Sequence, residues 1–175
     1  MEHRPLILTA RMDAQAQAHF QALRTLYFPP ERNFIPAHLT LFNHLPPSLL
    51  EEACDVLKAM VAHTPILKAQ VRALRFLGRG VAYDIYCPDL HHLRAELAER
   101  WLPLLTPQDK APMRAHVTVQ NKVTAQVAKT TFTHLQAEFV PRAMHITGLD
   151  LHYYEGGPWS PIRGFSFRGM GNYSG

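Results

Sequence analysis

Two short segments of the sequence combine a histidine and a threonine in a pattern that could do acid–base chemistry. The first is HLTL at residues 38–41, and the second is HVTV at residues 116–119. Each lies in a run of aliphatic and β-branched residues that predicts a β-strand. Because side chains alternate across a strand, the histidine and threonine of each motif should share one face. The two intervening apolar residues should then face a core.

Two such histidines could transfer protons on opposite sides of a phosphodiester. An imidazole has an unperturbed pKa of about 6.5, so its neutral and protonated forms are both accessible near neutral pH. We expect His116 to take a proton from the attacking oxygen and His38 to give one to the leaving oxygen. The hydroxyls of Thr40 and Thr118 could donate to the phosphate oxygens. In a cyclic phosphodiester, attack and departure occur on opposite sides of phosphorus, which suits two catalysts facing each other.

The elements that would position the motifs repeat along the chain. Strand, helix, motif strand, helix and strand are predicted over residues 5–12, 13–26, 38–45, 49–62 and 65–77. The same order is predicted over residues 79–87, 88–105, 116–123, 124–139 and 144–155, with one more strand at 159–169. The motif histidines are 116 − 38 = 78 residues apart, nearly half of the 175-residue chain. We therefore expect an α+β fold with two similar lobes, in which two antiparallel sheets face a central cleft and helices pack outside.

Length and composition are typical of one soluble domain. The chain has 175 residues, of which 47% are hydrophobic and 18% charged. No apolar stretch approaches the roughly 20 residues that cross a bilayer, and the N-terminal apolar run is too short for a signal peptide. We expect a single two-lobed domain over residues 1–175, a monomer located in the cytoplasm and without a membrane partner.

The net charge and the absence of metal-ligand clusters favour an anionic ligand and a site without metal. The net charge of +4 favours anionic partners, but no Lys/Arg-rich run of the nucleic-acid-binding type is present, so phosphate recognition should come from a formed pocket. Neither Cys54 nor Cys87 belongs to a Cys–His cluster, and the motif strands lack carboxylates. We expect no cofactor and no metal. A metal site built from some of the eleven histidines is the alternative.

Strict alternation extends the cleft-facing rows beyond the two motifs. Phe42 would share a face with His38 and could stack on a nucleobase. Gln120 and Lys122 would share a face with His116 and could bind a phosphate or the edge of a base. The alternatives are a core phenylalanine and two solvated residues at the end of a strand.

Two further candidates come from the predicted hairpins. Tyr83 and Tyr86 fall on opposite faces of one strand, and Tyr83 is the better candidate for the cleft. In the last hairpin, Tyr154, Trp159 and Arg163 could form a rim. Arg163 is the strongest of these because its guanidinium fork suits a phosphate.

The paired motifs resemble those of the two-histidine phosphoesterase superfamily, also described as LigT-like or 2'-5' RNA ligase-like. The resemblance covers nearly the whole chain in element order, and HLTL and HVTV are its most specific part. It implies a bilobal α+β fold, with a metal-independent site in the central groove.

The resemblance also implies roles and a substrate class. His38 and His116 would be the catalytic pair, and Thr40 and Thr118 the phosphate binders. The expected activity is hydrolysis of 2',3'-cyclic phosphates of nucleotides or RNA ends, so a nucleotide or RNA-derived phosphodiester is the expected partner. Two alternatives stay open: a non-catalytic or weakly catalytic protein that binds nucleotides or RNA ends, and a 2'-5' RNA ligase.

Overall fold

The computed structural model describes residues 3–170, which form an α+β fold on one antiparallel seven-stranded sheet. The strands are β1 (Leu6–Met12), β2 (Leu39–Leu45), β3 (Leu67–Phe76), β4 (Val81–Tyr86), β5 (His116–Gln120), β6 (Arg142–Tyr154) and β7 (Trp159–Ser166). The longer helices are α1 (Ala14–Tyr27), α2 (Leu50–His63), α3 (Pro88–Trp101) and α5 (Ala125–Glu138). Shorter helical segments are η1 (Pro30–Arg32), η2 (Pro47–Leu49), η3 (Leu102–Leu104) and α4 (Pro107–Lys110). The α+β class predicted from the sequence is confirmed.

The order of strands reads the same from both ends when matching elements of the two chain halves are exchanged. It runs β2-β1-β6-β3-β4-β5, and β7 also pairs with β6. Exchanging β1 with β4, β2 with β5 and β3 with β6 turns this order into its own reverse, and every one of these pairings is antiparallel. The motif strands β2 and β5 therefore hold corresponding places at the two ends of the order.

The long strand β6 joins what the sequence predicted as two sheets. Its first part pairs with β3, from Arg142 opposite Val71 to Ile146 opposite Leu67. Its later part pairs with β1 and also with β7. Because one strand takes part in all of these pairings, the hydrogen bonds make a single continuous sheet. We call its two parts the β1–β2 half, which includes β7, and the β4–β5 half, which includes β3.

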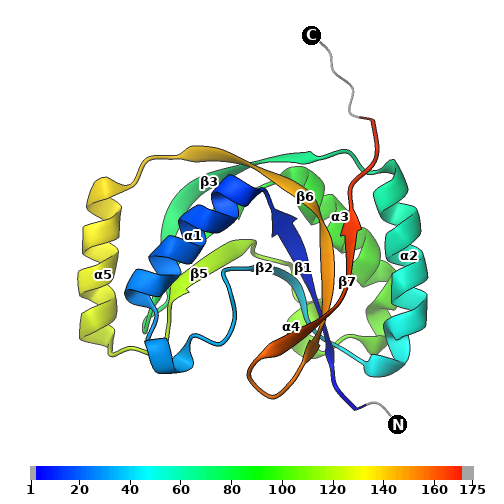
Figure 1. Cartoon of the computed structure of the whole chain (residues 1–175), viewed down its shortest axis with the longest axis horizontal. Helices are drawn as coiled ribbons and strands as arrows, with labels where there is room; N and C mark the ends of the chain where they lie inside the picture. The colour runs from blue at the N-terminus through cyan, green and yellow to red at the C-terminus, as the bar shows by residue number, and fades with distance from the viewer. Residues whose placement is uncertain (1–2, 171–175) are drawn as a thin grey trace.

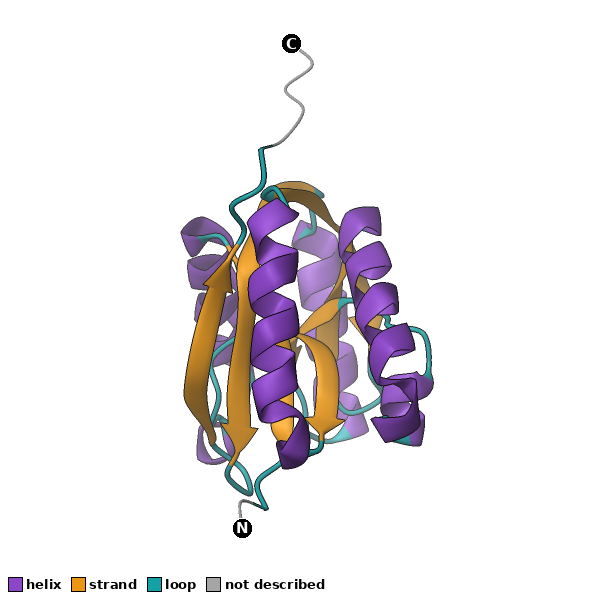
Figure 2. Ribbon diagram, turned by 90° about the vertical axis from the view of Figure 1, so that its right-hand side faces the viewer, coloured by secondary structure: helices purple, strands orange, loops and turns teal. Residues whose placement is uncertain are grey.

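The helices cover one face of this sheet, and the motif histidines lie on the other. α1 packs against β5, α5 packs against β3 and β4, and α2 packs against β7. Figure 1 shows α1 and α5 at one end of the sheet and α2 and α3 at the other. In Figure 2, helices stand in front of the strands on the side that faces the viewer. Within residues 3–170, no helix has both the length and the apolar character needed to cross a bilayer.

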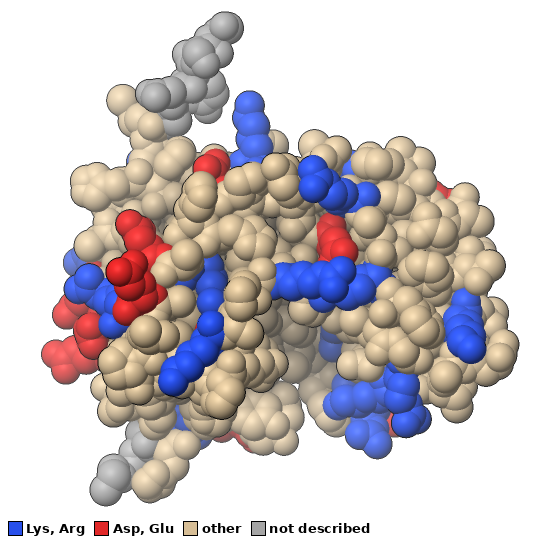
Figure 3. All heavy atoms as spheres, turned by 180° about the vertical axis from the view of Figure 1, so that it is seen from behind, with Lys and Arg blue, Asp and Glu red and all other residues tan. Residues whose placement is uncertain are grey.

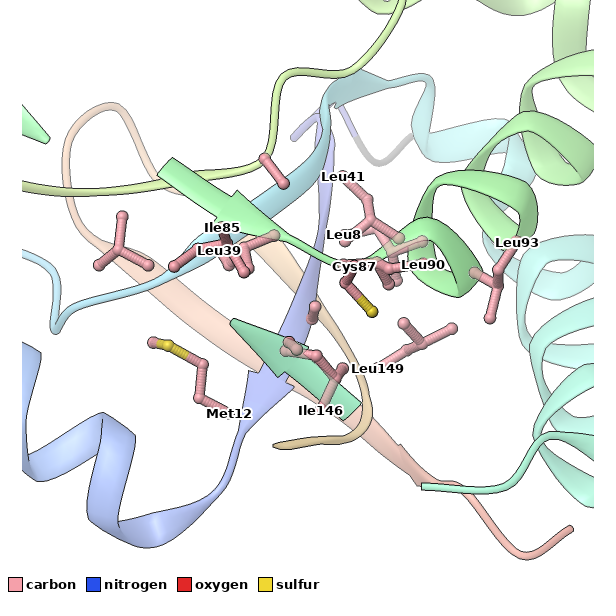
Figure 4. Packing of buried hydrophobic residues seen from close by; sticks show 14 of the residues in the cluster. Leu8, Met12, Leu39, Leu41, Ile85, Cys87, Leu90, Leu93, Ile146 and Leu149 are labelled. Carbon is pink, nitrogen blue, oxygen red and sulfur yellow. The ribbon is translucent and has the colours of Figure 1, made fainter. Parts of the chain in front are cut away.

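The core lies between the sheet and the helices, where the apolar residues of the strands alternate inward. Leu8, Leu39 and Leu149 are each 0% exposed, and they belong to one cluster with residues of α3. Figure 4 shows this packing of aliphatic side chains from β1, β2, β4, β6 and α3. Burial of apolar surface stabilises the fold by roughly 25 cal/mol per Å². This packing anchors the backbone of β2, so that its polar side chains project from the opposite face.

Candidate active site

The two motif strands are the terminal strands of the sheet order, yet they approach each other in space. The sheet curves so that Cα atoms of β2 and β5 come within 8 Å. His38 and His116 are both half-buried, and the charge of His116 acts on His38. The tertiary structure therefore brings the two histidines into one site, although 78 residues separate them (116 − 38 = 78).

Each motif strand contains the same kind of β-bulge directly after its threonine. The pairing of β2 with β1 skips Leu41, and the pairing of β5 with β4 skips Val119. Along both motifs the side chains are in turn half-buried, buried, half-buried, buried and buried. A bulge adds one residue to a strand and interrupts its alternation. The residue after each bulge, Phe42 or Gln120, is therefore turned toward the helices.

These bulges correct two predictions of substrate contact. Phe42 is 0% exposed, and its ring packs on Trp101 of α3 with the ring centroids 5.5 Å apart. Gln120 is 2% exposed, and its Nε2 donates to Oγ1 of Thr131 on α5 at 2.8 Å. Both residues lie under the helices because the bulge moves them off the face that carries the histidines.

The two motif histidines are oriented in the same way. His38 Nδ1 donates to the carbonyl oxygen of Pro36 at 2.9 Å, and His116 Nδ1 donates to the carbonyl oxygen of Arg114 at 2.7 Å. A carbonyl oxygen only accepts, so Nδ1 carries the proton in each neutral ring. The other nitrogen, Nε2, is then the atom of each ring that can take up or release a proton in a reaction.

Two side chains of α1 hold the backbone just before His38. Gln17 Nε2 donates to the carbonyl oxygen of Ala37 at 2.8 Å, and Gln21 Oε1 accepts from the Ala37 N–H at 2.8 Å. Gln17 and Gln21 are one helical turn apart, so their side chains project from the same side of α1. Ala37 is 3% exposed, and both of its backbone polar groups are thereby satisfied. Helix α1 thus sets the position at which β2 begins.

His38 sits in a more aromatic and more desolvated environment than an ordinary surface histidine. Its ring lies against Trp159 of β7, with centroids 4.6 Å apart. Burial lowers the pKa of His38 to about 4. The positive charges of Arg24, His116 and His152 act on this pKa in the same direction. His38 is therefore neutral at pH 7.

One residue of this environment, His152, was not among the sequence candidates. Its Nε2 lies 3.0 Å from Oγ1 of Thr9, and its ring centroid is 5.2 Å from that of Trp159. Burial lowers the pKa of His152, and the Asp150 carboxylate opposes that shift. The sequence could have indicated it, because Asp150 and His152 alternate along β6 with leucines that are buried, as expected for polar residues on one face of a strand.

Two buried arginines each bind the carbonyl side of a motif strand. Arg24 on α1 donates from Nη1 to the carbonyl oxygen of Thr118 in β5 at 3.1 Å. Arg94 on α3 donates from Nε to the carbonyl oxygen of Leu41 in β2 at 3.2 Å. Each helix therefore supports the motif strand that is not next to it in the chain. Burial lowers the pKa of Arg24 to about 10, so its guanidinium remains charged at pH 7.

Ion pairs flank the histidines on the same face of the sheet. Arg11 Nη2 lies 2.8 Å from Oδ1 of Asp150 in the β1–β2 half. In the β4–β5 half, Asp84 is paired across the strands with His116 and forms ion pairs with Arg75 and, at 3.5 Å, with Arg114. Each acid near the site is therefore neutralised by an arginine, which leaves the site suited to an anion.

The structure places Tyr83 and Lys122 outside the site. Tyr83 pairs with Val117 and so lies on the helix face, where its ring is 5.5 Å from that of Phe20. It lines a pocket between α1 and α5, and burial raises its pKa to about 12. Lys122 lies beyond the end of β5 with a left-handed φ of 62° and is exposed, so strand alternation does not reach it. The prediction for Tyr83 is therefore wrong, and the basis for the Lys122 prediction is lost.

Arg163 also lies on the helix face. It pairs with Leu151, which is 1% exposed in the core, and its guanidinium is 5.1 Å from the ring centroid of Phe165. Its charge acts on the thiol of Cys54 in α2. The neighbouring Gly164, opposite Asp150, faces the histidine side. The predicted phosphate contact by Arg163 is therefore wrong.

The metal alternative has no ligand set in the part of the chain that the structure covers. Across residues 3–170, no three His, Cys, Asp or Glu side chains gather as ligands of one ion. The histidine Nδ1 atoms of the two motifs are already bonded to backbone carbonyls.

Comparisons with known proteins bear on the family and the fold of this chain. The family model of the 2'-5' RNA ligase superfamily matches residues 12–158. The protein TT0787 of Thermus thermophilus has a similar structure, with a TM-score of 0.69 and 16% identity over 95% of this chain and 100% of that chain. E. coli LigT complexed with 3'-AMP has a TM-score of 0.65 and 17% identity over 95% of this chain and 99% of that chain. No curated protein matches the chain. At these identities the structural likeness is evidence about the fold.

Proposed function

Because this chain belongs to the 2'-5' RNA ligase superfamily, we propose that it is a phosphodiesterase that hydrolyses 2',3'-cyclic phosphates of nucleotides or RNA ends. The observation that carries the proposal is the matched pair of motif strands. His38 and His116 lie in one site, each on a strand with the same bulge and each with Nδ1 bonded to the carbonyl oxygen two residues before it. That pairing leaves two Nε2 atoms for one reaction centre.

The lowered pKa of His38 favours it as the general base. At pH 7 its Nε2 is unprotonated and can take a proton from water as the water oxygen attacks phosphorus. The bond from phosphorus to the 2' or 3' oxygen then breaks, and the protonated Nε2 of His116 gives its proton to that oxygen. This assignment reverses the roles expected from the sequence, because a histidine with a pKa of about 4 is neutral at pH 7 and its Nε2 then carries no proton to donate.

The motif threonines complete the proposed site. Thr40 and Thr118 are both half-buried and share their strand faces with the histidines. Their hydroxyls would donate to the two non-bridging oxygens as negative charge builds on them. Asp84 is shared by two arginines, Arg75 and Arg114, so this group carries one net positive charge that would attract an anion. E. coli LigT structures with 3'-AMP, NADP+ and ATP are similar in fold, which supports a ligand of nucleotide size.

The test is hydrolysis of a panel of 2',3'-cyclic nucleotides and a cyclic-phosphate-ended RNA, with EDTA present. We expect turnover that falls by about 10²- to 10⁴-fold in His38→Ala and in His116→Ala. His44→Ala is the matched control, since His44 is an exposed histidine of β2, the strand that begins directly after His38. Activity that survives loss of both motif histidines, or that needs a metal, would contradict the proposal.

The same assay separates the two alternative functions. A protein that binds nucleotides without turning them over would show affinity for a 3'-phosphorylated RNA and no product from any substrate. A ligase would join the cyclic-phosphate end to an added RNA with a 5'-hydroxyl, because that hydroxyl would replace water as the nucleophile.

A further inference from the structure

An exposed aromatic residue, Tyr86, lies on β4 two residues beyond the partner of His116. Asp84 of β4 pairs directly with His116, and Tyr86 lies two residues further along the same strand. Tyr86 therefore points to the same face of the sheet as His116, at a distance of about 7 Å along the strand from Asp84. It is 45% exposed, whereas Tyr83 on the other face is 6% exposed. Of these two tyrosines, Tyr86 is the one that a ligand of His116 can reach.

An arginine stacks on Tyr86 because of a third β-bulge. Arg72 is the residue that the pairing of β3 with β4 skips, between Val71 and Ala73. Its guanidinium carbon lies 3.7 Å from the centroid of the Tyr86 ring. A stacked guanidinium keeps its edge free to donate to a phosphate while its plane extends the aromatic surface. We call this stacked pair the Tyr86–Arg72 platform; the guanidinium covers one face of the ring and gives the pair a positively charged rim.

A second arginine flanks the platform from the side of His116. The Ile85 N–H donates to the carbonyl oxygen of Ala115 at 3.0 Å, so β4 stays bonded to this segment one residue past the Asp84–His116 pair. Tyr86 and Arg114 are the next residues of the two segments. The Arg114 side chain is 71% exposed, and its backbone carbonyl is the group that orients His116. The backbone of Arg114 therefore orients His116, and its side chain flanks the platform.

Charge is distributed over the molecule in a way that agrees with an anionic ligand here. Five exposed acids lie on the outer helices α2 and α3 at the far end of the β1–β2 half: Glu51, Glu52, Asp55, Glu96 and Glu99. The other exposed acids of residues 3–170 are Glu31, Asp89, Glu138 and Glu155. Figure 3 shows Lys and Arg side chains across the middle of the molecule seen from behind, and most of the Asp and Glu of this view at its left-hand end. Next to the platform, Lys68 and Gln70 of β3 are exposed on the same face.

We propose that Tyr86, Arg72 and Arg114 form a nucleotide subsite that holds a residue of single-stranded RNA next to the scissile phosphate. The proposal rests on the phosphodiesterase function proposed above. A base would stack on the Tyr86–Arg72 platform, and Arg72 and Arg114 would bind the adjoining backbone phosphates. The preferred substrate is then an oligoribonucleotide with a 2',3'-cyclic end rather than a free cyclic mononucleotide.

The test compares a cyclic mononucleotide with a trinucleotide that ends in a 2',3'-cyclic phosphate. Wild type should have the higher kcat/KM on the trinucleotide. Tyr86→Ala should lower that value by about fivefold or more, as expected for the loss of base stacking, and leave the mononucleotide value unchanged. Tyr86→Phe should keep the preference because it keeps the ring. Arg100→Ala is the control for Arg72→Ala, since Arg100 is 58% exposed on α3, away from this face.

Binding of a fluorescein-labelled, 3'-phosphorylated RNA, followed by anisotropy, tests the subsite without turnover. Tyr86→Ala should raise its Kd by about fivefold or more, and Arg72→Ala should reduce the slope of log Kd against log salt by about 0.7. If wild type turns over neither substrate, the phosphodiesterase proposal fails and this measurement alone decides the subsite. An unchanged Kd in Tyr86→Ala, or an equal loss on both substrates, overturns the subsite.

Discussion

The guanidinium of Arg24 donates from Nη1 to the carbonyl oxygen of Thr118, 3.1 Å away, and so links α1 to the bulge of the second motif strand. Arg24 is 3% exposed and also donates from Nε to Oδ1 of Asn33 at 2.7 Å. Its charge is one of those that lower the pKa of His38. One buried side chain therefore supports the strand of His116 and tunes the imidazole of His38.

Arg24→Met should test both effects of this residue. We expect the free energy of unfolding to fall by about 1–3 kcal/mol, because the Thr118 carbonyl and the Asn33 amide oxygen lose a buried donor. The pKa of His38 should rise, because a positive charge that disfavours its protonation is removed. Urea unfolding measures the first change, and an NMR titration of the imidazole measures the second. Arg32→Met, at an exposed position of η1, is the control, and a His38 pKa that stays in place would contradict the electrostatic part.

The pH profile should distinguish the two possible roles of His38. As a base it acts only in its neutral form, which is present above its pKa of about 4. We therefore expect the acidic limb of kcat/KM to lie near pH 4, well below the pH of about 6.5 at which an unperturbed histidine titrates. If His38 were the acid, kcat/KM would instead increase as the pH falls toward 4. A profile measured over the range in which far-UV circular dichroism shows the protein folded decides between them.

Trp159 should help to keep His38 neutral. Its ring lies 4.6 Å from the His38 ring and excludes water from one side of it. Trp159→Ala should admit water, raise the pKa of His38 toward its ordinary value and move the acidic limb of kcat/KM to higher pH. Trp159→Phe keeps an apolar ring and should shift the limb less. An acidic limb at the same pH in wild type and in Trp159→Ala would show that other groups desolvate His38.

Asp109 should be important for stability although it is remote from the reaction. It is 1% exposed, and its two carboxylate oxygens accept from the backbone N–H groups of Asn43 and His44, each at 2.9 Å. Asp109→Ala would leave two backbone donors without an acceptor and should lower the free energy of unfolding by about 2–4 kcal/mol. Asp109→Asn keeps one acceptor oxygen and should cost less. Equal urea midpoints for wild type and Asp109→Ala would show that water replaces the carboxylate.

Much of the frame of this protein could be predicted from local patterns. Alternation correctly placed Leu39 and Val117 in the core and put each motif histidine on the same face as its threonine. The repeated element order predicted an α+β fold with the two motif strands in matching places, and the strand order has that symmetry. These features depend on residues close together in the chain, so a single sequence carries them.

Alternation failed where a strand gains a residue relative to its partner. The bulges after Thr40, after Thr118 and at Arg72 arise from pairing with strands that are distant in the chain or across a hairpin. No residue type at these positions predicts a bulge. They explain why Phe42 and Gln120 are in the core. The choice of Tyr83 over Tyr86 failed for a related reason, because only the pairing of Asp84 with His116 shows which face of β4 is the histidine face.

The sequence by itself determined which residue types could do the chemistry and that they recur at matching points of two chain halves. The tertiary structure decided which of them meet: it placed Trp159 against His38 and added His152 next to Trp159. It also gives the lowered pKa of His38 on which the proposed role of base rests, because a pKa depends on desolvation and on charges brought near through space. Those depend on how the sheet curves and where the helices pack, which short stretches of sequence do not specify.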